Sequence, residues 1–122
     1  MSLQDEFQNR IQEVKQRFVS RLGEQALDFR ALQKQLRDSR YSGVALGELR
    51  IGVHKIRGVA PTFGLAALGD KADAVEQMIN AILAKQAGPD TKQRLDTSID
   101  TLLLEMGAIF VKDRALAKTD QA

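Results

Sequence analysis

The chain contains a single histidine, His54, and the residues around it have the types and spacing that chemistry on a phosphate requires. On a helix, Arg57 at i+3 and Gly58 at i+4 share a face with this histidine. The stripe that holds the histidine runs through Gly47, Ile51, His54, Gly58 and Pro61. Glycine inside a helix costs about 1 kcal/mol relative to alanine. Gly58 is therefore easiest to explain if another molecule approaches this face closely.

Such a face can support phosphoryl transfer through an imidazole. Near neutral pH much of a histidine population is uncharged, which leaves one ring nitrogen with a free lone pair. That nitrogen can attack phosphorus when the N–H of the other nitrogen is held by an acceptor. A nearby cation offsets the charge on the phosphoryl oxygens. We expect Arg57 to supply this cation, with Lys55 as the second candidate, and Glu76 or Asp73 to supply the acceptor.

The segment also resembles the histidine-containing phosphotransfer (HPt) domain, including that of chemotaxis kinases. The family pattern reads roughly His-x-(Leu/Ile)-Lys-Gly, followed by small residues and a glycine ten positions after the histidine. The matching residues in this chain are His54, Ile56, Arg57, Gly58 and Gly64. A Gln or Glu twenty-two positions after the histidine is also typical of the family, and Glu76 occupies that position. The resemblance covers residues 18–110, although its specific motif is confined to residues 54–76.

The resemblance implies that His54 carries a phosphoryl group between proteins of a two-component signalling system. The donor would be a sensor or hybrid histidine kinase or the aspartyl phosphate of a receiver domain, and the acceptor would be the aspartate of another receiver domain. The receiver would hold the Mg²⁺, so no cofactor is expected on this chain, and Ile51 and Gly58 would contribute to docking. The family also favours a monomer. This chain departs from the pattern at Arg57, which replaces the usual lysine and changes the hydrogen-bond geometry. Val59 and Pro61 also differ from the family pattern, at positions that affect the docking surface or the helix end more than the chemistry.

Helices are the elements that must position these residues. The two prolines and the neighbouring glycines predict breaks near residues 39–43, 61–64 and 87–90. Between the breaks, apolar residues recur at a helical period, and no stretch alternates as a strand would. In the second segment the stripe consists of Leu46, Leu49, Val53, Ile56, Ala60 and Phe63. Since Pro61 lacks an N–H, we expect the helix of His54 to kink or end near Ala60.

Helices with one apolar face each, joined by short loops, favour an all-α fold: an up-and-down antiparallel four-helix bundle. We expect the bundle over residues 18–112, a helical extension over residues 1–17 and a polar, frayed tail over residues 113–122. Upstream, a stripe of Phe7, Ile11, Val14, Phe18 and Leu22 predicts helix. Gly23 either bends this long helix or separates a short extra N-terminal helix from it, and both alternatives stay open.

Composition excludes several classes of function. With no cysteine and one histidine, disulfides and zinc sites built from Cys or several His are excluded. The net charge of +2 is too small and too evenly spread to favour nucleic-acid binding. No apolar run approaches the ~20 residues of a membrane span, and no signal-peptide pattern is present, so we expect a cytoplasmic protein without membrane contact.

The chain also lacks a nucleotide-binding loop. We therefore expect a phosphocarrier with no kinase activity of its own. The alternative is a helical scaffold that docks a signalling partner through Ile51, Gly58 and Pro61 without carrying phosphate. A hydrolase with His54 as general base is poorly supported, because no Ser or Cys nucleophile lies in a recognisable motif.

Overall fold

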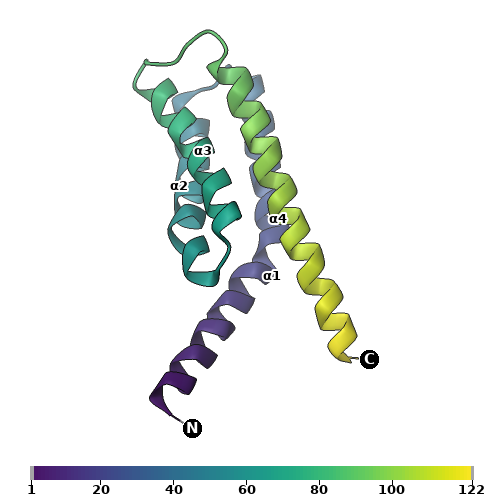
Figure 1. The fold of residues 1–122 in the computed structure, drawn as a ribbon. Helices are drawn as coiled ribbons and strands as arrows, with labels where there is room; N and C mark the ends of the chain where they lie inside the picture. The colour runs from purple at the N-terminus through teal and green to yellow at the C-terminus, as the bar shows by residue number, and fades with distance from the viewer. Residues whose placement is uncertain (1, 122) are drawn as a thin grey trace.

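Four helices make up nearly all of the part of the chain that the structure describes. The computed structural model describes the backbone of residues 2–121 and the side chains of residues 2–116. This part of the chain forms no strands, and its elements are α1 (Leu3–Asp38), α2 (Gly43–Val59), the short 3₁₀ helix η1 (Ala60–Phe63), α3 (Ala66–Leu83) and α4 (Thr91–Gln121). Successive helices run in opposite directions, and the two termini lie at the same end (Figure 1). The predicted all-α four-helix bundle is confirmed.

The apolar faces of the helices form one continuous core. Helix α2 packs on α3, α3 on α4 and α4 on α1, whereas α1 and α2 pack less closely. All six apolar residues of the predicted second stripe are buried. Leu68, Ala72, Val75 and Ile79 of α3 meet them in the same core. The site-bearing helices α2 and α3 are thus held against each other along their lengths.

The helix ends follow the predicted breaks. Ser42 caps α2, since its hydroxyl accepts a hydrogen bond from the amide of Ala45. At the other end α2 stops at Val59, and the chain tightens into η1 at Pro61, so the predicted end near Ala60 is confirmed. Gly64 then closes the turn with φ +72°, a left-handed conformation that glycine adopts without strain. This glycine therefore has a conformational reason to be there.

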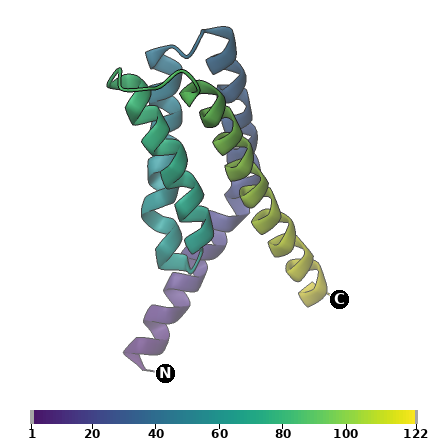
Figure 2. The same ribbon diagram turned by 45° about the horizontal axis from the view of Figure 1, so that its top comes forward.

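Helix α1 runs without interruption through Gly23, so the alternative of a separate short N-terminal helix is wrong. A Cβ at Gly23 would lie 3.0 Å from the ring of Phe110, so the glycine lets the two long helices approach each other. In the expected extension, residues 1–17, Ser2 caps α1 and residues 3–17 belong to its first half, whereas Met1 lies outside the described residues. Figures 1 and 2 both show this half and the end of α4 spreading apart beyond the other two helices.

The polar tail continues as helix, because α4 extends to Gln121. Ala122 lies outside the described residues, and so do the side chains of residues 117–121. The fraying of residues 113–122 stays a prediction. Among residues 2–121, no helix combines the length and the apolar character that a membrane span requires.

A polar cluster joins α1 to α4 at the end of the bundle away from the termini. Gln33 is buried and donates hydrogen bonds to the Asp96 carbonyl and to Asp100 Oδ1. The Tyr41 hydroxyl donates to Asp96 Oδ2 at 2.6 Å. Burial, and next the bond to Asp96, raise the pKa of Tyr41 to about 12. The cluster fixes the turn from which α2 begins.

Candidate functional site

Helices α2 and α3 bring the candidate residues together on one flank of the bundle. Val53 and Ile56 are fully buried and fix the rotation of α2, which places His54 and Arg57 beside the core stripe. On α3, the fully buried Val75 and Ile79 fix the rotation of the helix and so place Glu76 beside the core. The outcome is a histidine, an arginine and a glutamate that face one another across the α2–α3 interface.

The imidazole of His54 projects into solvent while one of its nitrogens is held from behind. Its side chain is 66% exposed, and Nδ1 lies 2.6 Å from Oε2 of Glu76, whose side chain is only 6% exposed. Of the two acceptors considered from sequence, Glu76 makes this contact. The buried carboxylate therefore orients the ring by its Nδ1 side and leaves the opposite, Nε2, side toward water.

Arg57 neutralises the buried carboxylate. Its guanidinium Nη1 donates to Oε1 of Glu76 and lies 3.5 Å from Oδ1 of Asp73. Asp73 is about half exposed and also accepts a weak hydrogen bond from Gln77. A buried carboxylate is stable in its charged form when a cation and hydrogen bonds satisfy it. Glu76 is thus an ionised acceptor, shared between Arg57 and His54.

This arrangement selects the tautomer of the neutral imidazole. An ionised carboxylate only accepts hydrogen bonds, so the bond at 2.6 Å places a proton on Nδ1 of His54. In the neutral ring, Nε2 then carries the free lone pair. A nitrogen nucleophile on an exposed, oriented ring is the chemical group that this site offers.

The surface around the imidazole is open and shallow. A hollow of about 330 Å³ is lined by Arg50, Ile51, His54, Lys55 and Glu76. Ile51 is 60% exposed. A Cβ at Gly58 would meet nothing within 4 Å, so neither packing nor backbone conformation explains this glycine. Lys55 is exposed and borders both this hollow and a larger groove on the α1 side of α2.

Sequence reasoning did not single out Arg50, although its spacing offered a signal. Arg50 lies four residues before His54, so the two share a helix face. Its guanidinium donates a hydrogen bond to the side chain of Asn80 on α3 at 3.3 Å and borders the hollow. It is a third cation, besides Arg57 and Lys55, close to the histidine.

No group of three or more His, Cys, Asp or Glu side chains in the described part of the chain is arranged to hold a metal ion. Comparisons with protein-family models, with curated proteins and with solved structures found no match to this chain. Function is therefore inferred from the geometry around His54 and from the motif that surrounds it.

Proposed function

We propose that this chain is a histidine phosphotransfer protein of a two-component signalling system and carries a phosphoryl group on Nε2 of His54. The observation that carries the proposal is the pairing of a 66% exposed imidazole with a buried carboxylate at 2.6 Å on Nδ1. The match of His54, Arg57, Gly58, Gly64 and Glu76 to the HPt pattern supports the same conclusion.

In the proposed reaction the lone pair of Nε2 forms a bond to the phosphorus of a receiver's aspartyl phosphate. The bond between phosphorus and the aspartyl oxygen breaks, and its electron pair leaves with the aspartate carboxylate. The proton on Nδ1 of His54 stays in place. The ring therefore gains positive charge, which the carboxylate of Glu76 stabilises at 2.6 Å. Transfer to a second receiver reverses these steps, and the Mg²⁺ would belong to the receiver.

The partner would dock on the open surface around the imidazole. Ile51 provides an exposed apolar contact, and Gly58 lets a partner backbone come close to the helix. Lys55 and Arg50 place positive charge near the phosphoryl oxygens, and Arg57 balances the charge of Glu76. The proposal includes a cytoplasmic location and the absence of kinase activity in this chain.

Labelling with a chemical donor tests the proposal without knowledge of the natural partner. The protein is incubated with phosphoramidate, and the product is followed by phosphorus NMR and by its stability in acid and base. A label on a histidine is lost in acid and retained in base. We expect this label on the wild-type chain and none on His54→Gln. A wild-type chain that takes up no label from phosphoramidate or from any phosphorylated receiver would contradict the proposal.

A second candidate is a docking module that carries no phosphate, and the open surface at Gly58 and Ile51 favours it. It predicts that His54→Gln leaves partner binding and signalling intact, whereas Gly58→Arg abolishes binding. Phosphocarriage predicts instead that His54→Gln keeps binding but loses signalling.

A further inference from the structure

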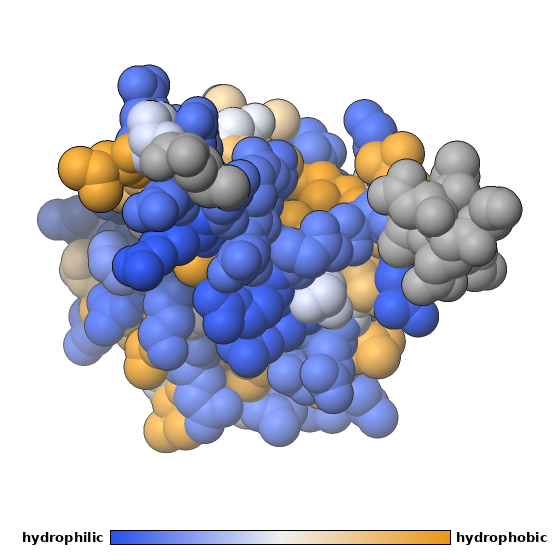
Figure 3. All heavy atoms as spheres, turned by 90° about the horizontal axis from the view of Figure 1, so that it is seen from below, coloured by the Kyte–Doolittle hydropathy of each residue, from blue (hydrophilic) through white to orange (hydrophobic). Residues whose placement is uncertain are grey.

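The first half of α1 carries an apolar stripe that the bundle covers only in part. Phe7 is 61% exposed and Val14 is 46% exposed, and Ile11 lies between them on the same side of the helix. The stripe continues into the half-buried Phe18, whose ring packs against Phe63 at a centroid distance of 5.4 Å. The steps of four, three and four residues are those of a two-stranded coiled coil. Apolar patches interrupt the polar surface at this end of the molecule (Figure 3).

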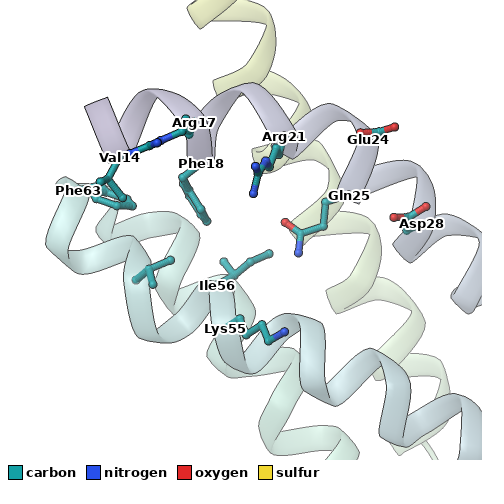
Figure 4. A pocket seen from close by; sticks show the side chains of 11 residues that line it. Val14, Arg17, Phe18, Arg21, Glu24, Gln25, Asp28, Lys55, Ile56 and Phe63 are labelled. Atoms are coloured by element: carbon teal, nitrogen blue, oxygen red, sulfur yellow. The ribbon is translucent and has the colours of Figure 1, made fainter. Parts of the chain in front are cut away.

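The stripe leads into a groove of about 790 Å³ between α1 and the α2–η1 corner. Its apolar lining includes Phe18, Ile56 and Phe63, and Arg17 and Arg21 of α1 lie beside it. Figure 4 shows Phe18 and Arg21 directed from α1 toward Ile56 on α2. The groove thus has an apolar floor and a basic rim at the end nearest the free stripe.

One flank of the stripe carries charges of alternating sign. They are Glu6, Arg10, Glu13 and Arg17, again spaced by four, three and four residues, so all four lie on one side of the apolar stripe. None of the four forms an ion pair within the described part of the chain. When two copies of this helix pack antiparallel, the charged flank of one copy meets the same flank of the other copy. The charges of the second copy then run in the opposite order. Each glutamate then faces an arginine.

We propose that two copies of this chain pair through the first half of α1, antiparallel and around a two-fold axis. In this register Phe7 of each copy enters the groove of the other at Phe18, and Ile11 packs against Val14 of the second copy. The matching ion pairs join Glu6 to Arg17 and Arg10 to Glu13, each formed twice. A two-fold interface requires a surface that is complementary to itself, and both the apolar and the charged pattern of α1 meet this requirement.

The dimer differs from the monomer that the HPt resemblance implies, and it does not depend on the proposed phosphotransfer. His54 is directed toward Glu76 on α3, whereas the groove lies on the α1 side of α2. Alternating charges four residues apart also stabilise single helices through pairs within one chain. Glu6, Arg10, Glu13 and Arg17 form no such pairs with the described side chains. The experiment distinguishes the two explanations, because only pairing between copies changes when two variants are mixed.

The test uses two variants with opposite flanks. Glu6→Arg/Glu13→Arg makes the flank basic, and Arg10→Glu/Arg17→Glu makes it acidic. In sedimentation equilibrium we expect the wild-type chain at twice its 13.5 kDa mass. We expect each variant alone at the single-chain mass, and an equimolar mixture of the two at twice that mass again. A monomeric wild-type chain, variants that dimerise alone, or a mixture that stays monomeric would each overturn the proposal.

Two further variants keep the test valid if the reversed flanks disturb folding. Phe7→Asp is expected to abolish the dimer, and Gln12→Asp, on the opposite side of the helix, is expected to leave it unchanged.

Since the chain has no cysteine, single introduced cysteines report whether the two helices pair parallel or antiparallel. A Glu6→Cys chain should form a disulfide with an Arg17→Cys chain and not with itself. Disulfides between two Glu6→Cys chains would indicate parallel pairing and refute the register.

Discussion

Replacing Glu76 by glutamine tests the chemical core of the proposed function with almost no change in shape. Glu76 accepts hydrogen bonds from His54 Nδ1 at 2.6 Å and from Arg57, and its side chain is only 6% exposed. A glutamine has one acceptor oxygen, and its NH₂ group must face one of the two donors. The variant therefore loses one charge-assisted hydrogen bond and the negative charge that stabilises the phosphorylated ring.

The size of the effect follows from the lost interaction. A hydrogen bond to a charged group contributes about 1.5–3 kcal/mol. Since about 1.4 kcal/mol corresponds to a factor of ten in rate, we expect the phosphotransfer rate of Glu76→Gln to fall roughly 10- to 150-fold. The free energy of unfolding should fall by only about 1 kcal/mol, because Arg57 is 42% exposed and regains solvent.

The assay is single-turnover transfer of label from a phosphorylated receiver domain to His54, with Asp73→Asn as the matched control. Asp73 also faces Arg57, but at 3.5 Å and with 48% of its side chain exposed, so its loss should change the rate by less than about fivefold. Transfer by Glu76→Gln at the wild-type rate would refute the role assigned to the buried carboxylate. An equal loss in Asp73→Asn would show that charge near the site matters and that the hydrogen bond to His54 does not.

Three further outcomes follow from the backbone and from the polar cluster. Gly58→Ala should raise the free energy of unfolding by about 0.5–1 kcal/mol in urea denaturation, because its Cβ meets nothing, and should still slow transfer between partners. Gly64→Ala should lower the free energy of unfolding by about 1–2 kcal/mol in the same assay, because φ is +72° there. Tyr41 is the single tyrosine, so tyrosinate absorbance should titrate with a pKa of about 12, and Asp96→Asn should move it toward 10.0. Because the folded-state pKa is the raised one, the wild-type chain should lose this contribution to stability between pH 10 and 12. Denaturation midpoints that stay constant across that range would contradict this assignment.

Helical periodicity was enough to predict the fold and much of the site. The proline and glycine breaks predicted the ends of α2, and the stripe from Leu46 to Phe63 predicted its buried face. The same periodicity placed Arg57 and Gly58 beside His54, because neighbours on one helix depend only on spacing along the chain. Glu76 lies on another helix, so helical spacing alone could not choose between Glu76 and Asp73 as the acceptor for His54. The family pattern, with Gln or Glu twenty-two positions after the histidine, pointed to Glu76.

Contacts between distant segments could not be read from the chain. Gly23 looks like a helix breaker, yet it serves the approach of the Phe110 ring from the far end of the sequence. The angle at which α2 leaves α1 depends on a turn in which Arg40 and Tyr41 both have positive φ, at 54° and 62°. The residue types do not predict a left-handed turn there, because neither Arg40 nor Tyr41 is a glycine or an asparagine. The groove beside Phe18 is lined by α1 together with α2 and η1, so it too depends on contacts between segments that are distant in the sequence.

The contacts of Arg57 suggest a second role for it besides the expected contact with the phosphoryl group. Its guanidinium is bonded to Glu76 and lies near Asp73, so two carboxylates already neutralise it before any phosphate arrives. Within the described residues, Lys55 has no ion pair, and Arg50 bonds only to the neutral side chain of Asn80. These two cations are therefore freer to meet phosphoryl oxygens, whereas Arg57 keeps Glu76 ionised in its buried position. In the proposed phosphotransfer, Arg57 therefore stabilises the carboxylate that orients the ring, and Lys55 and Arg50 are the cations that would contact the phosphoryl oxygens.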